Sequence, residues 1–257
     1  MTKLIIMFTM IITGMICKAQ VSESRNSTNF SEIEVSNGIE LFYQQSNEAA
    51  SIRVESTSEE ALKSVKTESN NGILKIYSTN KEISNNSKIK VFVTGNTLKS
   101  IKGKSKSRIV FQKTTNASDM TISLSTGAYF NGRIVSAKKI ELNADATSEF
   151  NGRIETQKFT GNFKNKSRIN LSGTALDATI TSTKKSYCNA KNFLVENAKI
   201  RSDDSTVIIT SENILAVDLT ENAKLTYFGQ PKDVTIKHAT NCTVEKTKTA
   251  KVLLASK

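Results

Sequence analysis

Few side chains in this sequence have the types and spacing that catalysis or metal binding requires. The chain contains one histidine, His238, so neither a histidine pair for a metal nor a Ser-His-Asp triad is supported. After residue 98, Asp203 and Asp204 form the only adjacent acidic pair. Four further aspartates do not occupy one position of the sequence repeat described below, so we do not expect them to stack into one column: Asp119, Asp145, Asp177 and Asp218. We therefore expect no catalytic residue, no metal site and no cofactor. Two facing carboxylates of the glycosidase kind are the enzymatic alternative that stays open.

The N-terminal segment has the pattern of a cleaved export signal. A basic start precedes an apolar run over 4–12, and Cys17 and Ala19 then fit the −3 and −1 positions of a cleavage site. This pattern predicts a signal peptide over residues 1–19 and export to the periplasm, the cell surface or the medium. The run is shorter than the roughly 20 residues that span a bilayer, so no transmembrane segment is expected in the mature chain. A lipid anchor at Cys17 is the alternative, which the large Ile16 before it disfavours.

The charge balance is strongly basic. The 257 residues include 36 Lys and Arg against 24 Asp and Glu, a net charge of +12. Such a balance suits acidic partners, namely nucleic acid, an anionic polysaccharide or a membrane surface. We expect no nucleic acid, because no zinc-finger, RRM or helix-turn-helix pattern occurs. Polysaccharide is the favoured ligand of the three, and a basic surface that serves solubility alone is the plainer alternative.

Apolar residues alternate singly with polar ones along most of the chain, which is typical of strands rather than helices. After a flexible N-terminus over residues 20–29, alternating runs are separated by Asn37-Gly38 and by Asn71-Gly72. Asn-Gly favours hairpin turns, because both central residues of such a turn need positive φ. We therefore predict an all-β protein that begins with an antiparallel β layer over residues 30–97.

From residue 98 to residue 248 the sequence repeats. FNGRI occurs at 130–134 and at 150–154, and a small residue followed two positions later by a mostly apolar one recurs every 18 to 21 residues. The pairs are Ser107/Ile109, Ala128/Phe130, Ser148/Phe150, Ser167/Ile169, Ser186/Cys188, Ser205/Val207, Ala223/Leu225 and Asn241/Thr243. One coil of this length cannot bury its apolar face alone, whereas a stack can. The period therefore predicts a parallel β-solenoid of seven or eight coils, about 4.8 Å apart.

Two details of this solenoid follow from the same pattern. Gly132 and Gly152 are expected to give successive coils the backbone freedom to turn the same corner. Right-handed coiling is expected by analogy with parallel crossover connections. Residues 249–257 are left as a C-terminal tail.

Several motifs resemble those of a known family. They are IEVSNGIEL at 33–41, NGILKI at 71–76, KVFVT at 90–94 and YFGQP at 227–231. Together they are similar to the head GIN domain of auto-transporter adhesins, a family of unknown function common in Bacteroidetes, over about residues 30–245. The resemblance implies a pectin-lyase-like β-helix without its catalytic residues, and a role in cell adhesion. The glycine and proline positions expected in structural turns are Gly38, Gly72, Gly132, Gly152, Gly229 and Pro231.

The alignment of the repeats also places the two cysteines that follow the signal segment far apart in the solenoid. Cys188 falls in the apolar column, whereas Cys242 falls in the adjacent, outward column three coils later. Three coils correspond to about 14 Å, against the less than about 7 Å between Cα atoms that a disulfide requires. We therefore expect no disulfide between them.

The residue between the small and the apolar member of each pair is expected to point outward. These residues form the candidate ligand surface, called the outward column. Bases and aromatic rings stacked at the coil spacing offer a flat face on which sugar rings can stack and acidic groups can pair. The alternative is a solvated ladder without a ligand. The residues proposed to contact a ligand are Arg108, Tyr129, Arg168, Tyr187 and Lys224.

The resulting hypothesis is a non-catalytic envelope adhesin that recognises a polysaccharide or a surface protein through a rigid solenoid face. Two alternatives stay open. One is an assembly protein of the envelope that pairs with a protein partner, with oligomerisation left open, and the other is a carbohydrate-active β-helix enzyme.

Overall fold

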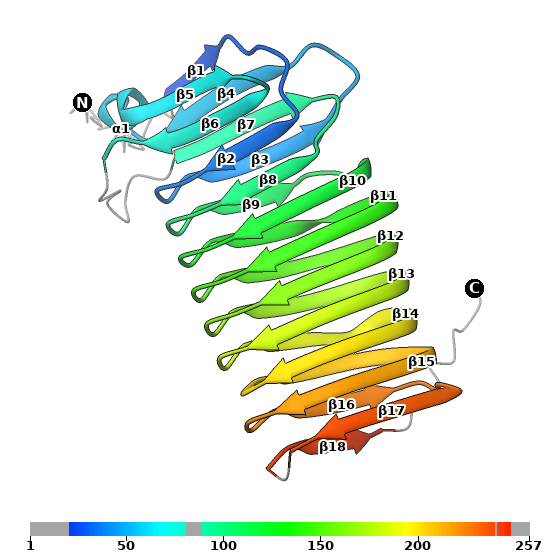
Figure 1. The fold of residues 1–257 in the computed structure, drawn as a ribbon. Coiled ribbons are helices and arrows are strands. Elements are labelled where there is room, and N and C mark those ends of the chain that lie inside the picture. The colour runs from blue at the N-terminus through cyan, green and yellow to red at the C-terminus, as the bar shows by residue number, and fades with distance from the viewer. Residues whose placement is uncertain (1–20, 81–88, 240, 248–257) are drawn as a thin grey trace, which may run out of the picture.

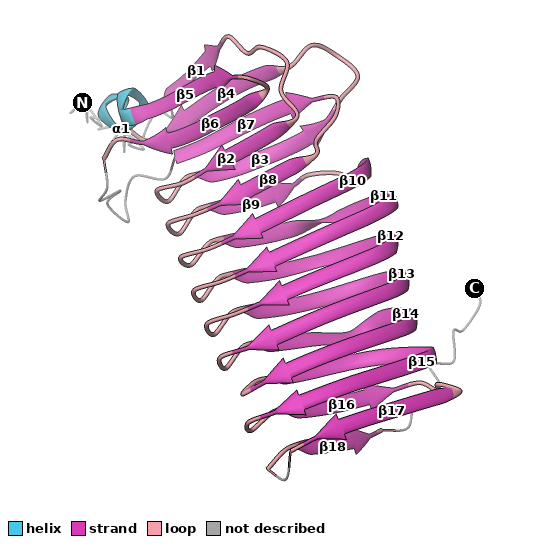
Figure 2. Cartoon of the chain, in the orientation of Figure 1, coloured by secondary structure: helices cyan, strands magenta, loops and turns pink. Residues whose placement is uncertain are grey.

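The computed structural model describes residues 21–80, 89–239 and 241–247, and the predicted signal segment lies outside them. Figures 1 and 2 show a rod of stacked strands with a smaller sheet across its N-terminal end. One core cluster of buried side chains runs from Phe30 to Tyr227, through both parts of the rod. The predicted all-β class with a parallel solenoid is confirmed, with about 8 turns of about 19 residues.

The solenoid is built from eleven strands, and each stacks in parallel on the equivalent strand of the next coil. They are β8 (Ser100–Gly103), β9 (Arg108–Phe111), β10 (Thr115–Leu124), β11 (Tyr129–Ala144), β12 (Glu149–Phe163), β13 (Arg168–Thr183), β14 (Tyr187–Asp203), β15 (Thr206–Thr220), β16 (Lys224–Phe228), β17 (Asp233–His238) and β18 (Thr243–Lys246). Each long strand from β11 to β15 has two halves, separated by an exposed interruption such as Thr156–Lys158 in β12. The two halves share one core, so their outward side chains lie on opposite faces of the rod.

The N-terminal layer contains seven strands and the short helix α1 (Glu59–Ser64). The strands are β1 (Val21–Arg25), β2 (Glu32–Val35), β3 (Glu40–Gln45), β4 (Ser51–Ser56), β5 (Val65–Asn70), β6 (Ile73–Ser78) and β7 (Ile89–Gly95). The pairs β1–β4, β4–β7 and β5–β6 are antiparallel. However, β2 and β3 pair in parallel with β6 and β7 on one side and with β8 and β9 on the other. The layer is therefore mixed rather than wholly antiparallel.

The two Asn-Gly pairs explain this difference. Asn71-Gly72 joins β5 to β6 as the predicted antiparallel hairpin. The hairpin prediction at Asn37-Gly38 is wrong, because β2 and β3 do not pair with each other but stack on β8 and β9. Both residues have positive φ, and the Gly38 amide donates to the Ser105 carbonyl of the next coil at 3.0 Å. A pair of left-handed residues therefore forms a coil corner as readily as a hairpin.

The same kind of corner recurs down the solenoid, along the left edge of Figure 1. Most corners place two consecutive residues at positive φ, and most of these residues are not glycine. Adjacent corners are hydrogen-bonded: the Lys166 amide donates to the Lys184 carbonyl at 3.0 Å, and the Lys185 amide to the Asp204 carbonyl at 2.6 Å. The left-handed pairs are Ser105/Lys106, Thr126/Gly127, Ala146/Thr147, Asn165/Lys166 and Lys184/Lys185.

The prediction that Gly132 and Gly152 form corners is wrong. Both lie inside strands β11 and β12, and neither has positive φ. A Cβ on Gly132 would lie 2.7 Å from Phe111 Cβ, and one on Gly152 would lie 2.6 Å from Phe150 Cζ. The motif FNGRI therefore repeats because large rings fill the core at two adjacent coils and leave no space for a further side chain.

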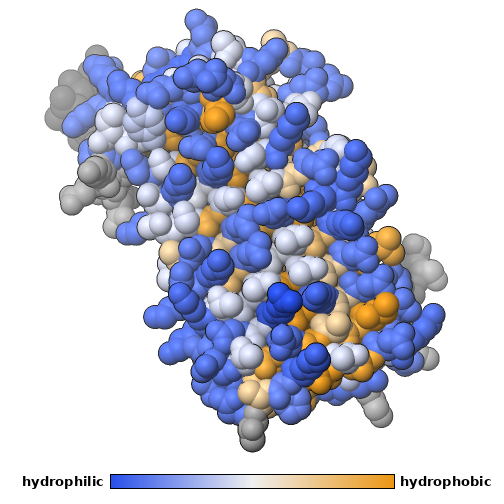
Figure 3. Space-filling view, viewed as in Figure 1, coloured by the Kyte–Doolittle hydropathy of each residue, from blue (hydrophilic) through white to orange (hydrophobic). Residues whose placement is uncertain are grey.

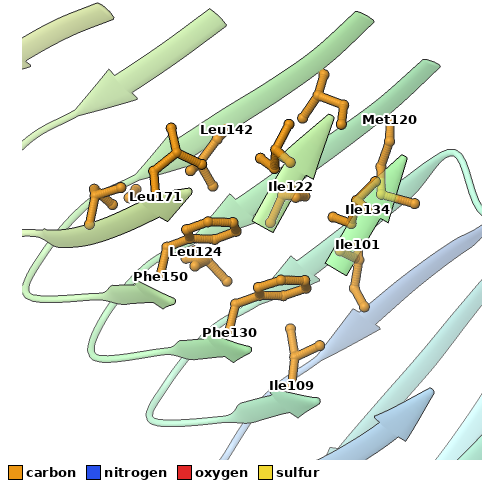
Figure 4. Close-up of a cluster of buried hydrophobic side chains, with 14 of the residues drawn as sticks. Ile101, Ile109, Met120, Ile122, Leu124, Phe130, Ile134, Leu142, Phe150 and Leu171 are labelled. Atoms are coloured by element: carbon orange, nitrogen blue, oxygen red, sulfur yellow. The ribbon is translucent and has the colours of Figure 1, made fainter. Parts of the chain in front are cut away.

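The predicted apolar column forms the centre of this core. Phe130 and Phe150 stack face to face, with ring centroids 5.0 Å apart and an interplanar angle of 3°, and Figure 4 shows them among the buried aliphatic side chains. The column continues in register through Ile169, Cys188, Val207 and Leu225.

The last predicted pair, Asn241/Thr243, is wrong by one residue. Leu225 pairs with Val244, so Cys242 takes the small position that stacks on Ala223. The interval there returns to 19 residues, whereas the prediction continued the 18-residue interval of the preceding coil.

Candidate ligand-binding face

The predicted outward column exists at the start of the strands that follow each corner. Arg108, Tyr129, Glu149, Arg168, Tyr187, Thr206 and Lys224 occupy consecutive rungs of one ladder. Below Arg108 the ladder continues to Glu40. Beyond Lys224 the rung is Thr243, not Cys242 as predicted, because of the one-residue shift.

A second ladder lies beside the first and was not singled out from the sequence. Each of its members stands two residues after a member of the outward column, so both ladders project from the same face. The Asn189 Oδ1 accepts a hydrogen bond from the Lys191 amide, whereas the other three amide side chains have no hydrogen bond to any other described residue. The residues are Asn131, Asn151, Asn170 and Asn189.

The signal for this ladder is present in the sequence as an asparagine two residues after four consecutive column positions, Tyr129, Glu149, Arg168 and Tyr187. Its members offer both donors and acceptors at the coil spacing, which suits a ligand rich in hydroxyl groups.

The N-terminal part of the column is closed by its own side chains. The Arg108 guanidinium carbon lies 4.1 Å from the centroid of the Tyr129 ring, and Arg108 Nε lies 3.2 Å from Glu40 Oε1. The cation therefore covers the aromatic ring, and the carboxylate balances its charge. Of the five predicted contact residues, Tyr129 alone is half-buried, and the other four are exposed.

The middle of the column is open. A groove of about 910 Å³ crosses three coils here. The Tyr187 side chain is 41% exposed. Arg168 and Glu149, on adjacent rungs, form no ion pair or hydrogen bond through their side chains with any described residue. The groove is lined by Thr147, Glu149, Lys166, Arg168, Asn170, Lys185 and Tyr187.

A smaller hollow of about 310 Å³ continues this groove over the corner ridge. It shares Lys166 and Lys185 with the groove. Its remaining lining residues are Asn165, Lys184 and Asp204. Lys224 lies outside both, two rungs beyond Tyr187 and separated from it by Thr206. The structure therefore gathers Arg168 and Tyr187 into one hollow and leaves Lys224 apart.

The acidic residues are placed away from one another. The four aspartates do not share one column. Asp119 and Asp177 share one, with Lys139 and Lys158 on the rungs between them, whereas Asp145 and Asp218 lie outside it. Asp203 accepts a hydrogen bond from the Thr220 hydroxyl at 2.8 Å. Within the described ranges, no three His, Cys, Asp or Glu side chains gather in a way that could hold a metal ion.

The remaining chemically reactive groups lie elsewhere. His238 is exposed on β17, and its Nδ1 lies 3.1 Å from the Ala239 carbonyl oxygen. Cys188 is fully buried, and burial raises the pKa of its thiol to about 12, so its reactive thiolate form is scarce at neutral pH. Cys188 and Cys242 are both free. Cys188 lies in the apolar column, whereas Cys242 lies in the small-residue column almost three coils later and not in the outward column as predicted.

Comparison with known proteins shows where this chain belongs. Residues 29–231 match the family described as "Putative auto-transporter adhesin, head GIN domain". The chain is a member of this head GIN family. No curated protein matches it. The family resemblance inferred from the sequence is thereby confirmed.

Solved structures with the same fold include three proteins from Parabacteroides species. A "putative adhesin" from Parabacteroides merdae ATCC 43184 is 16% identical, with a TM-score of 0.79 over 89% of this chain and 96% of the other. A "putative adhesin" from Parabacteroides distasonis ATCC 8503 is 15% identical, with a TM-score of 0.81 over 89% and 97%. A "putative lipid binding protein" from the same strain is 17% identical, with a TM-score of 0.74 over 89% and 96%. At these identities the likeness shows the fold of the head GIN family alone.

No helix in residues 21–80, 89–239 or 241–247 is long and apolar enough to cross a membrane. The described part of this head GIN chain is a solenoid with an open groove over Arg168 and Tyr187 on one face.

Proposed function

We propose that this chain is a non-catalytic, exported recognition protein of the cell envelope that binds a glycan through the open part of the outward column, around Arg168 and Tyr187, and the asparagine ladder beside it. The observation that carries this proposal is the pair of ladders on one face, with three consecutive asparagines whose amides make no hydrogen bonds to other described residues. Free amides repeated at the coil spacing, with the exposed Tyr187 ring beside them, make weak contacts that add along a rigid rod. Membership of an adhesin family supports the same role.

The test is retention of the full-length protein on an array of neutral and acidic polysaccharides at about 150 mM salt, where long-range charge effects are screened beyond roughly 8 Å. The informative variant is Asn151→Ala/Asn170→Ala, on neighbouring rungs of β12 and β13. Its matched control is Thr160→Ala/Thr179→Ala, in the same two strands but on the opposite face. We expect the asparagine variant to lose retention and the threonine variant to keep it.

Three results would contradict the proposal. Retention that both variants lose equally would mean that the ladder is not the contact. Absence of retention on every glycan would point to a protein partner. Release of new reducing or unsaturated sugar ends during the assay would instead show an enzyme.

An assembly role is the second candidate, and one observation favours it. The exposed large hydrophobic side chains of the described residues all lie in the C-terminal half, where Figure 3 also shows more hydrophobic surface on the visible face. They are Leu176, Tyr187, Leu194, Ile214 and Val234. A molecular mass that rises with protein concentration would support this role, and a constant monomer mass would exclude self-assembly.

A further inference from the structure

We infer that the open groove around Arg168 and Tyr187 binds a single acidic sugar unit, a uronic-acid type of residue, within a mostly neutral glycan. This inference rests on the proposed glycan-binding function and adds the chemical class of the unit recognised. Three observations support it: the unpaired cations of the groove, the exposed Tyr187 ring beside them, and the acidic residues at both edges of the basic surface.

The charge of the groove is unbalanced. Three basic residues line it, Lys166, Arg168 and Lys185, against the one carboxylate of Glu149. None of these four side chains forms an ion pair or hydrogen bond with another described residue. By contrast, Arg108 in the same column already has a carboxylate partner in Glu40. The groove therefore offers cationic groups that no acid of the described chain occupies.

The arrangement of these groups suits a carboxylated ring. Arg168 occupies the rung between Glu149 and Tyr187. Its planar guanidinium can hold a carboxylate through two parallel hydrogen bonds. The Tyr187 ring, 41% exposed on the next rung, offers an apolar face for the sugar ring. Asn170, two residues after Arg168 in β13, supplies an amide for the ring hydroxyls.

The extent of the basic patch argues against a long, uniform polyanion. The stacked corners of two coils carry its lysines, and Lys184 extends it into the smaller hollow. On one side the next corner begins at Asp145, whose Oδ1 accepts from Asn165 Nδ2 at 2.6 Å. On the other side, Asp204 stands directly after Lys185 in the corner ladder. A chain with an anion at every unit would meet these carboxylates, whereas one acidic unit would not.

The size of the groove agrees with this reading. A volume of about 910 Å³ lies within the range of roughly 300–1,000 Å³ that is typical of small-ligand sites. Such a volume accommodates a short segment of glycan. The neighbouring asparagine rungs would then contact the neutral units on either side.

The experiment measures binding of two probes by the full-length protein at about 150 mM salt. The first probe is an oligosaccharide with one uronic acid among neutral units, and the second is the same oligosaccharide with its carboxyl group reduced to an alcohol. The informative variant is Arg168→Gln, and the matched control is Arg108→Gln in the same column. Both arginines are exposed, and the melting temperature of each variant checks that it is folded.

We expect the carboxylated probe to bind about tenfold more tightly than the reduced probe, the equivalent of about 1.4 kcal/mol. Arg168→Gln should abolish that preference, and Arg108→Gln should leave it unchanged. Tyr187→Ala should weaken both probes alike, because the ring contacts the sugar and not the charge.

The outcomes separate this inference from the function on which it rests. Equal binding of the two probes would overturn the acidic-sugar assignment and leave glycan recognition standing. Equal loss in Arg168→Gln and Arg108→Gln would show that the overall positive charge, and not the groove, selects the anion. Failure of both probes together with failure on the whole array would remove the proposed function itself.

Discussion

The N-terminal half of the rod, up to residue 155, and the C-terminal half, from residue 156, share one core but differ in the pairing of their surface charges. Every ion pair between described residues lies within residues 23–155. In the N-terminal half, for example, Lys102 Nζ lies 2.9 Å from Glu34 Oε1, and Arg133 and Arg153 both contact Glu155. From residue 156 to residue 247 the described side chains form no ion pair. A solenoid does not need surface ion pairs to hold its coils together.

The two arginine–tyrosine pairs of the outward column show the consequence. Arg108 followed by Tyr129 and Arg168 followed by Tyr187 have the same spacing of one rung. Only the first pair is closed, because Glu40 holds Arg108 and the guanidinium lies over the ring. The comparison shows that the arginine contacts the ring and a carboxylate in the first pair, and that neither contact forms among the described residues in the second.

Gly173 lies where β13 stacks closely on β12, and its substitution should have the largest effect. Gly173 has a φ of +113°, and a Cβ there would lie 2.0 Å from the Ile154 carbonyl oxygen of the preceding coil. We expect Gly173→Ala to lower the free energy of unfolding by about 3 kcal/mol, at the upper end of common single substitutions. Urea denaturation measures this change, and hydrogen exchange should show earlier loss of protection in β13 and β14 than in β2 and β3.

The control for that prediction is Gly127→Ala. Gly127 also has positive φ, but a Cβ there would meet only Lys106 Cγ at 3.5 Å, an ordinary contact. Its expected cost is about 1 kcal/mol, from backbone strain alone. Equal losses of unfolding free energy in the two variants would mean that the close approach of β12 to β13 adds nothing to the cost of the substitution.

The second prediction separates the closed pair from the open one. Arg108→Ala removes both the contact with the Tyr129 ring and the ion pair with Glu40, and should lower the free energy of unfolding by about 1 kcal/mol. Arg168→Ala, on the equivalent side of Tyr187, should change it by less than about 0.5 kcal/mol. Urea denaturation of both variants checks the difference, and a larger loss in Arg168→Ala would reverse the comparison.

The repeat itself could be read from the sequence because the structure is periodic. Small and apolar residues at fixed spacing gave the register of Ile109 through Leu225, since each coil presents the same two positions to the core. The asparagine ladder was equally periodic, and a search of every position in the register would have found it. Local pattern thus predicted the architecture and one face of the candidate site.

Features that depend on contacts distant in the sequence could not be read in this way. Asn37-Gly38 gives the same left-handed pair in a hairpin and in a coil corner, and only the stacking of β2 and β3 on the solenoid decides between them. Likewise, Glu40 closes over Arg108 from a strand far earlier in the chain, so no local signal distinguishes the covered Tyr129 from the open Tyr187.

The smallest predicted effect concerns pH. Hydrogen bonds from Arg153 and Arg133 hold the pKa of Glu155 below its usual value of 4.5. A carboxyl group with a lowered pKa in the folded state stabilises the fold above its usual pKa, and this contribution is lost as the pH falls through the folded-state pKa.

Glu155→Gln should therefore lower the free energy of unfolding by about 0.5 kcal/mol at neutral pH, the scale of exposed ion pairs, and by progressively less as the pH falls below 4.5. Glu196→Gln, in the half without ion pairs, should change stability at neither pH, because Glu196 makes no hydrogen bond or ion pair with a described residue. Urea denaturation at neutral and acidic pH measures both variants. The same pH-dependent difference in both would show that net charge, rather than specific pairing, distinguishes the two halves.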